Sequence, residues 1–365
     1  MNGDIKAGND MRKTFFDIEN QCKFRFESNG PFWHLYTDGR VMEVVFGDGY
    51  EFCEGMNLSG NCAITFLGVR ILTFELMSNH VHFIIAGKRE DCDAFFLYIK
   101  ERLRIFLRRS INLSKFEYRL EPIADLNALR NEIVYVNRNG YLAHLSNTPY
   151  SYPWGAGHCY FNPFWKLIPK IRFSELAVNT RRAIFHTKDI GLTSSCAASN
   201  DSVTSNDSVT SNDSASSNPR AAYLDLKAIQ NFLECLYEKE KLPKTRQSIM
   251  LDPASFCYIA EGESYFRSAH HYFNLLSKNY EAYSIISRRI GDSVFLSDED
   301  MYSAVTSLCY RKFNVKSIPE LSPNAKIEVA KMMHFDYNAS NKQISRILKL
   351  DLYYVDTFFP KPQLR

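Results

Sequence analysis

The alternation of apolar and polar positions predicts both strands and helices in the first half of the chain. Residues 32–37, 68–75 and 81–86 are short apolar runs rich in β-branched and aromatic residues, as is typical of strands. Residues 91–109 instead repeat their apolar side chains at the spacing of an amphipathic helix. The pattern therefore predicts an α+β fold for this half.

A second helix is expected over residues 125–140. Asp125 suits the N-cap, and Gly140 suits a left-handed residue that closes the helix. The buried face is defined by an apolar stripe at Leu126, Leu129, Ile133 and Val136. At about 100° per residue, Tyr135 and Asn139 fall on the opposite, polar face, away from the position of a core tyrosine.

The chain divides at a stretch of low complexity. Residues 199–204 and 205–210 repeat the same six residues, and a decayed copy follows. A segment with so few large apolar side chains cannot offset its ordering entropy, so we expect a flexible linker over 191–220. We predict a first domain over 1–190 and a mainly helical domain over 221–365.

Between residues 322 and 360, at the end of the second domain, the predicted helices and turns alternate as in a helix-turn-helix. Ser322 and Pro323 begin a helix that extends to about Phe335, a short helix follows over 341–348, and a last one over 351–359. In this reading the last helix enters a DNA major groove. The candidate contacts are Lys342, Arg346, Tyr353 and Tyr354; in the alternative, a plain helical bundle, Leu352, Tyr353 and Val355 are core residues.

The overall composition does not change the predicted fold, but the distribution of charge indicates a candidate binding surface for an anionic partner. The 365 residues are 45% hydrophobic and 23% charged, with a net charge of +3, which gives no global argument for nucleic acid. On the helix predicted over 91–109, Lys100, Arg104 and Arg108 recur every four residues, with Arg109 beside them. This face is either a site for an anionic partner such as DNA or an ordinary solvated surface.

We expect a cytoplasmic protein that does not enter a membrane. The nine cysteines form no C-x-x-C pair, which fits reduced thiols, and the first twenty residues are too polar for a secretory signal. The most apolar segment, 66–77, is interrupted by Arg70 and Glu75 and is too short to span a bilayer.

Two histidines supply the first candidate chemistry. His80 and His82 lie one residue apart where the strand 81–86 begins, so both face the same side while Val81, Phe83 and Ile85 face a core. Two imidazoles on one face are half of a divalent-metal site. The alternative is a pair of half-exposed histidines on a solvated strand face.

The pieces together predict phosphodiester chemistry. A tyrosine such as Tyr135 is a covalent nucleophile when a nearby cation stabilises the charge that develops. Asn139, one helical turn later, offers a carbonyl oxygen to the same metal as the histidines. The basic helix would then hold the rest of a nucleic-acid strand.

Residues 76–83, Leu-Met-Ser-Asn-His-Val-His-Phe, resemble the L-M-P-N-H-V-H-L signature of the REP-associated tyrosine transposases, which are single-tyrosine HUH endonucleases. Residues 135–140, Tyr-Val-Asn-Arg-Asn-Gly, resemble the Y-I-x-x-N-P motif of that family, 53 residues after His82. The similarity covers about residues 30–150. The chain departs from the motifs at Ser78 and Gly140, where the family has proline.

The resemblance implies a ferredoxin-like or RRM-like antiparallel sheet with flanking helices. It implies Tyr135 as the nucleophile that forms a 5′-phosphotyrosine, and His80, His82 and Asn139 as ligands of Mg²⁺ or Mn²⁺. The implied substrate is single-stranded DNA with hairpins, cleaved and rejoined in DNA transposition by a monomer or a homodimer. The C-terminal domain would recognise duplex or hairpin DNA.

Three other readings compete with this one. Histidine-triad hydrolases place histidine at three alternate positions, and the third position here is Ile84, which argues against them. A domesticated, transposase-derived protein would bind DNA without cutting it. A plain metal-binding or structural α+β protein would not bind DNA at all.

Overall fold

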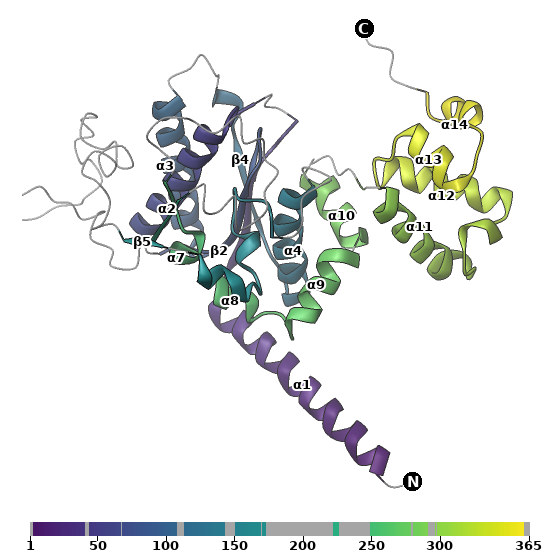
Figure 1. The fold of residues 1–365 in the computed structure, drawn as a ribbon, viewed down its shortest axis with the longest axis horizontal. Coiled ribbons are helices and arrows are strands. Elements are labelled where there is room, and N and C mark those ends of the chain that lie inside the picture. Colours follow the sequence, from purple (N-terminus) through teal and green to yellow (C-terminus); the bar gives the residue numbers. More distant parts are fainter. Residues whose placement is uncertain are drawn as a thin grey trace, which may run out of the picture.

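The structure, a computed structural model, describes residues 3–40, 44–66, 68–107, 113–142, 150–168, 170–172, 222–225, 249–278, 280–290, 296 and 298–360. It is an α+β protein built around a four-stranded antiparallel sheet (Figure 1). The strands are β1 (Phe32–Thr37), β2 (Arg70–Leu76), β3 (Val81–Ala86) and β4 (Tyr118–Pro122). They lie in the order β2-β3-β1-β4, and the three predicted strands are confirmed to within two residues at each end.

One face of the sheet is covered by α2 (Gly49–Thr65) and α3 (Arg89–Leu107). Val81, Phe83 and Ile85 of β3 point into this core, as the alternation predicted. The apolar stripe predicted on α3 is confirmed, because Phe95, Ile99 and Leu103 are buried in the same core and Phe106 packs against it. No helix was predicted over the residues of α2.

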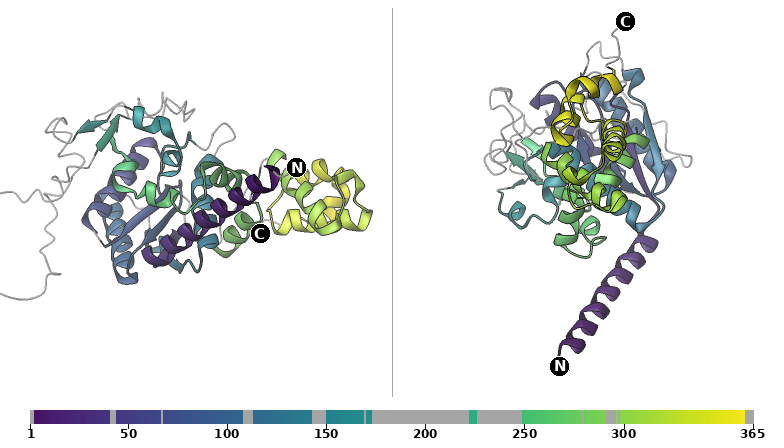
Figure 2. Two further views of the ribbon diagram at one scale, coloured as in Figure 1. Left: turned by 90° about the horizontal axis from the view of Figure 1, so that it is seen from below. Right: turned by 90° about the vertical axis from the view of Figure 1, so that its right-hand side faces the viewer.

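The other face of the sheet is covered by α4 (Leu126–Leu142). Outside α4 lie α9 (Ala269–Lys278) and α10 (Tyr280–Ile290), so that α4 contacts β2 and β3 on one side and these two helices on the other (Figure 1). The helix α1 (Gly3–Asn29) contacts α4 near its own C-terminal end and projects from the body (Figure 2). The helix that carries Tyr135 is therefore enclosed on two sides.

The two ends of α4 test two predictions. Asp125 caps the helix as expected, because its Oδ1 accepts a hydrogen bond from the backbone N–H of Ala128 at 2.8 Å. Gly140 does not close it, since the helix continues to Leu142. The glycine is required by a close approach instead: a Cβ at this position would overlap the ring of Tyr152 and lie 2.7 Å from a carboxylate oxygen of Glu75.

The second half of the chain is divided differently from the prediction. Residues 249–290, which were assigned to the helical domain, pack onto the sheet unit: Leu251 and Phe256 lie in the same core as Phe74. In this part, strand β7 (Ile249–Leu251) belongs to a small antiparallel sheet with β5 (Ile171–Arg172) and β6 (Ala222–Asp225), and the short helices α7 (Pro253–Phe256) and α8 (Ile259–Glu263) follow it. The predicted linker, 191–220, lies outside the described residues.

The remaining helices form a separate unit at one side of the molecule (Figure 1). They are α11 (Asp298–Phe313), α12 (Pro323–Phe335), α13 (Asn341–Leu348) and α14 (Leu352–Phe358), with a short 3₁₀ turn at Ile318–Glu320. The sheet unit has further 3₁₀ turns at Leu113–Lys115, Gly157–Cys159 and Pro163–Leu167. The predicted N-cap is confirmed, because Ser322 Oγ accepts from the N–H of Ala325 at 3.3 Å. Lys349 ends α13 in a left-handed conformation, with φ of 51°. The three predicted helices are thus confirmed, although their role is not.

A search of the described helices for one both long and apolar enough to cross a membrane finds none. The same residues carry seven cysteines, all buried and none in a disulfide.

A buried carboxyl group on α2 predicts a loss of stability as the pH rises. Burial raises the pKa of Glu54 to about 8, so the folded protein keeps a proton that the unfolded chain loses near pH 4.5. Because the unfolded state then binds fewer protons, the free energy of unfolding falls between these two pH values. We expect Glu54→Gln to be more stable than wild type by on the order of 2 kcal/mol at pH 8, and nearly equal to it at pH 4.5.

Urea unfolding of both proteins at several pH values measures this difference. A constant offset between them across the pH range would show that the Glu54 carboxyl does not titrate abnormally.

Candidate functional site

The two histidines lie together where β3 begins. The His80 and His82 ring centroids are 4.8 Å apart, with the rings nearly perpendicular. Both side chains face the same side, as predicted, but they are buried, with exposed fractions of 7% and 1%. This burial excludes the alternative of two histidines on a solvated strand face.

A third histidine, on β1, fixes the orientation of His82. His34 Nε2 lies 3.1 Å from His82 Nδ1, and His34 Nδ1 lies 2.9 Å from Glu132 Oε2 on α4. Burial raises the pKa of Glu132, but His34 and Arg289 outweigh this effect and hold its pKa below the usual value, so the group is a carboxylate. We refer to Glu132, His34 and His82 as the relay.

Hydrogen-bond chemistry sets the tautomers of the relay. A carboxylate only accepts, so His34 carries a proton on Nδ1; with His34 in its neutral form, its Nε2 then accepts from the Nδ1–H of His82. The Nε2 lone pair of His82 is then presented away from the relay. Ligating histidines are commonly held in this way, by donating the other ring N–H to a fixed acceptor.

His80 is oriented by its neighbour in the chain. Its Nδ1 lies 2.7 Å from Asn79 Oδ1, while Asn79 Nδ2 donates to the carbonyl oxygen of Gly39 at 2.6 Å. The second bond places the amide oxygen, and not the nitrogen, against the ring, so His80 carries its proton on Nδ1. Both histidines therefore present Nε2 as the basic nitrogen.

The candidate nucleophile lies beside the histidines. The ring of Tyr135 is 5.7 Å from the ring of His82 and 6.2 Å from that of His34, centroid to centroid. The structure thus brings Tyr135, His80 and His82 together from two separate elements. Tyr135 has no exposed surface, however, and Asn139 is also buried.

The prediction that Tyr135 and Asn139 lie on a polar face away from the core is therefore corrected. Tyr135 packs against the sheet through His34 and His82, and helix α10 is a second neighbour of α4. Tyr283 of α10 lies 4.7 Å from the Tyr135 ring, and its hydroxyl donates to Asn139 Oδ1 at 2.5 Å. The apolar stripe of α4 identifies its apolar contacts, but it cannot identify a polar part of the sheet or a helix from a distant part of the chain.

Two arginines border the same region. Arg138 is buried, and its guanidinium lies 4.9 Å from the centre of the Tyr283 ring and 3.6 Å from the Asp300 carboxylate. Arg289 of α10 pairs with Glu121 at 3.0 Å and also with Glu132 of the relay. The guanidinium groups of both arginines are therefore held in ion pairs in the region of Tyr135.

The donor atoms fit a divalent metal in number and type when Asn139 is included. Two imidazole nitrogens and one amide oxygen match the mixed preferences of Mn²⁺ better than the strict oxygen preference of Mg²⁺. Within the described residues, no group of three or more His, Cys, Asp and Glu side chains is placed to hold a metal ion. A metal held by His80 and His82 would therefore need a third ligand of another kind, and the sequence predicted Asn139 Oδ1, which accepts from Tyr283, for this role.

The predicted basic surface lies elsewhere. Helix α3 covers the face of the sheet opposite α4, so Lys100 and Arg104 are not next to the histidines. Arg104 is exposed and pairs with Glu101 at 2.6 Å, while Arg108 and Arg109 lie outside the described residues. Contact of all four residues with DNA stays a prediction, and for Lys100 and Arg104 any such contact is on the side of the sheet away from the histidines.

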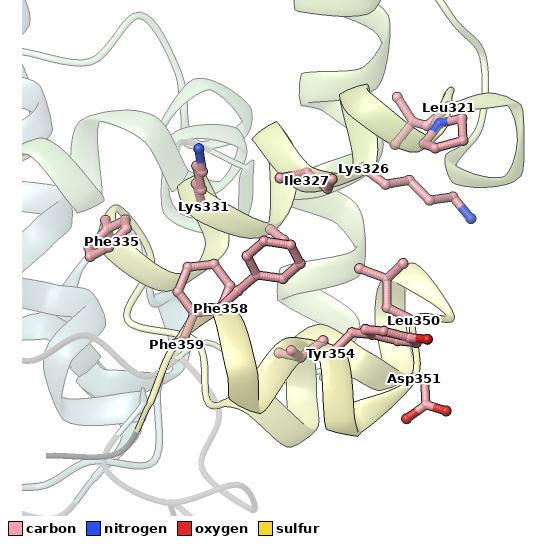
Figure 3. Close-up of a pocket in the computed structure, with 13 residues that line it drawn as sticks. Leu321, Lys326, Ile327, Lys331, Phe335, Leu350, Asp351, Tyr354, Phe358 and Phe359 are labelled. Atoms are coloured by element: carbon pink, nitrogen blue, oxygen red, sulfur yellow. The ribbon is translucent and has the colours of Figure 1, made fainter. Parts of the chain in front are cut away.

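The candidate helix-turn-helix presents aromatic rather than basic groups. On α14, Tyr353 and Tyr354 are 75% and 63% exposed, and the helix carries no lysine or arginine. On α13, Lys342 is exposed, whereas Arg346 pairs with Asp298 at 2.8 Å. Beside α14 lies an apolar pocket of about 550 Å³, in which Tyr354, Phe358 and Phe335 gather, with Lys326 and Lys331 at its rim (Figure 3).

No protein-family model, curated protein or solved structure matches this chain. The functional assignment therefore depends on the site itself.

Proposed function

We propose that the protein is a metal-dependent DNA transesterase of the tyrosine HUH type, which cleaves and rejoins single-stranded, hairpin-bearing DNA as a transposase does. The proposal is supported chiefly by one observation: the ring of Tyr135 lies 5.7 Å from the ring of His82. His82 is oriented by the relay, and His80, the other histidine of the pair, is oriented by Asn79. A tyrosine that packs on one oriented imidazole, with a second imidazole 4.8 Å from the first, matches the needs of phosphoryl transfer.

The topology of the sheet supports the proposal. The order β1-α2-β2-β3-α3-β4, with spatial order β2-β3-β1-β4, is that of a ferredoxin-like or RRM-like fold. In such a fold β3 is an inner strand, which suits a pair of metal ligands. The helix-turn-helix assignment for α12 to α14 belongs to the same proposal, and there the exposed aromatics suit stacking on unpaired bases.

In the proposed reaction the Tyr135 hydroxyl oxygen forms a bond to a backbone phosphorus of DNA. The bond between this phosphorus and the 3′ oxygen breaks, and the tyrosine proton ends on that oxygen as a 3′ hydroxyl. A metal held by His80, His82 and Asn139 would polarise a phosphoryl oxygen as a Lewis acid. Because the phosphotyrosine keeps the energy of the ester, another 3′ hydroxyl can reverse the step and join a new strand.

A second candidate is a DNA-binding protein that does not cut. The complete burial of Tyr135 favours it, since a nucleophile must reach its substrate.

The test is whether the wild-type protein forms a covalent adduct with DNA that depends on a metal. Labelled single strands with hairpins are incubated with Mn²⁺, with Mg²⁺ or with EDTA and run on denaturing gels. We expect an adduct with Mn²⁺ that EDTA abolishes and that peptide mapping assigns to α4. Binding in a gel shift without an adduct would favour the second candidate, and neither binding nor cutting would reject both.

A further inference from the structure

Tyr135 is closed off from any DNA strand in this conformation. Attack on phosphorus requires the reacting atoms to come within about 3–3.5 Å. A side chain with no exposed surface, enclosed by His82, His34 and Tyr283, leaves no room for a phosphodiester. If Tyr135 is the nucleophile, an element that covers it has to move.

Helix α10 covers Tyr135 and Asn139 of α4 on the side away from the strands. Its Tyr283 packs on Tyr135, hydrogen-bonds the amide oxygen of Asn139, and lies under the guanidinium of Arg138. The side chain of Tyr283 thus contacts the proposed nucleophile, a proposed metal ligand and the guanidinium of Arg138. The Tyr283 hydroxyl thus already bonds Asn139 Oδ1, the atom proposed as a metal ligand.

The helical unit holds α10 from its other side. Arg288 pairs with Asp336, at the end of α12, at 2.9 Å, and Ser284 donates to the backbone carbonyl of the same residue. Between α10, α11 and α12 lies a cavity of about 310 Å³ lined in part by Arg288, Arg311 and Lys312. The outer contacts of α10 are therefore polar and adjoin a basic cavity.

The inner contacts of α10 are also partly polar. Its buried apolar side chains are Tyr283, Ile286 and Ile290, whereas the Tyr283 hydroxyl bonds Asn139 and Arg289 pairs with Glu132 on α4. By contrast α4 buries a larger apolar set against the sheet, which includes Leu129, Ile133 and Val136. When a helix is released, its polar groups form new hydrogen bonds with water or DNA, so the net cost in free energy is small. The stabilising free energy of its buried apolar side chains is not replaced. Release of α10 is therefore easier than displacement of α4.

We propose that α10 is an intramolecular plug of the catalytic site, held closed by the α11–α14 unit and released when single-stranded DNA binds. The inference rests on the proposed function, since it assumes that Tyr135 must be reached. DNA phosphates compete with Asp336 for Arg288 and with Glu121 for Arg289. Release exposes Tyr135, takes the Tyr283 hydroxyl from Asn139, and uncovers Arg138 for the DNA backbone.

The first measurement is hydrogen–deuterium exchange of the full-length protein without DNA. Tyr283→Phe keeps the ring but removes the hydroxyl that donates to Asn139. We expect the amides of residues 280–290 to exchange about fivefold faster in this variant, which is the shift typical of one lost buried hydrogen bond, while those of α4 stay unchanged.

A matched control is available on α9. The hydroxyl of Tyr272 accepts from Asn137 Nδ2 at 2.9 Å, so Tyr272→Phe removes the same kind of bond to the same helix, away from the proposed ligands. The control should leave the exchange of residues 280–290 unchanged. Equal exchange of α10 and α4 in both variants would mean that α10 is an ordinary part of the core, and it would overturn the plug.

The second measurement is the rate of adduct formation with labelled hairpin DNA and Mn²⁺. Opening that precedes chemistry makes the rate proportional to the open fraction, so Tyr283→Phe should react about fivefold faster than wild type, and Tyr272→Phe should not. Adduct at equal rates in all three proteins would support the transesterase and overturn the plug. No adduct in any of them, with faster exchange confined to α10, would support the plug and reject the chemistry.

Discussion

Replacement of Tyr135 by phenylalanine is expected to reduce covalent DNA adduct by at least about a thousandfold, to below detection. Phenylalanine keeps the ring that packs between His82, His34 and Tyr283, so the fold and the closed state are preserved. It removes the oxygen that would bond to phosphorus. Gel shifts of the variant should therefore retain DNA binding, while denaturing gels show no adduct.

Tyr36 provides the control for this experiment. Its ring lies 6.3 Å from that of His82, close to the distance of Tyr135, and it is also buried. Burial and a hydrogen bond to Glu121, at 2.7 Å, raise the pKa of Tyr36 well above its usual value, which makes it a poor nucleophile. Tyr36→Phe should keep the adduct. An adduct that survives in Tyr135→Phe but is lost in Tyr36→Phe would reassign the nucleophile.

The local elements of the fold were largely predictable from the sequence. The bounds of β1, β3 and α13 follow from apolar patterning and end signals within a few residues of the chain, and the structure has them where the pattern put them. Gly140 shows the limit of such reasoning: its role depends on Tyr152 and Glu75, which are distant in sequence. No local pattern reports an approach of that kind.

The placement of His80 and His82 on one face was predictable, but the hydrogen bonds from His34 and Glu132 that orient His82 were not. Strand alternation places His80 and His82 on one face, and the same alternation along β1 places Phe32, His34 and Tyr36 on one face. A histidine between two buried aromatics, together with an acid one turn before Tyr135, was a signal that the sequence contained. It becomes a relay only through the pairing of β1 with β3, which alternation within each strand does not specify.

The layers of the fold were the least predictable feature. Which face of the sheet a helix covers is decided by the connections, so the basic side chains of α3 and the histidines of β3 were expected together but lie on opposite faces. In the same way, residues 249–290 were assigned to a separate domain, although they close the site. Both differences come from long-range packing, which depends on the whole chain.

Substitution of Glu132 by glutamine is expected to lower the affinity for Mn²⁺ by about 10–100-fold, the usual effect of removing a partner of a ligating histidine. A glutamine can donate as well as accept. When its amide donates to Nδ1 of His34, the proton of His34 moves to Nε2, and His82 must then accept at Nδ1. The proton of His82 is then on Nε2, where it blocks the nitrogen that would bind the metal.

Mn²⁺ titrations followed by calorimetry measure this affinity without any need for catalysis. Glu121→Gln is the matched control, because Glu121 also pairs with Arg289, at 3.0 Å, but takes no part in the relay. Loss of the Arg289 pair alone should leave the affinity unchanged, or raise it if α10 is loosened. Because a merely structural role of Glu132 would lower stability and leave the affinity of the folded protein intact, an unchanged affinity in Glu132→Gln would remove the relay from the metal site.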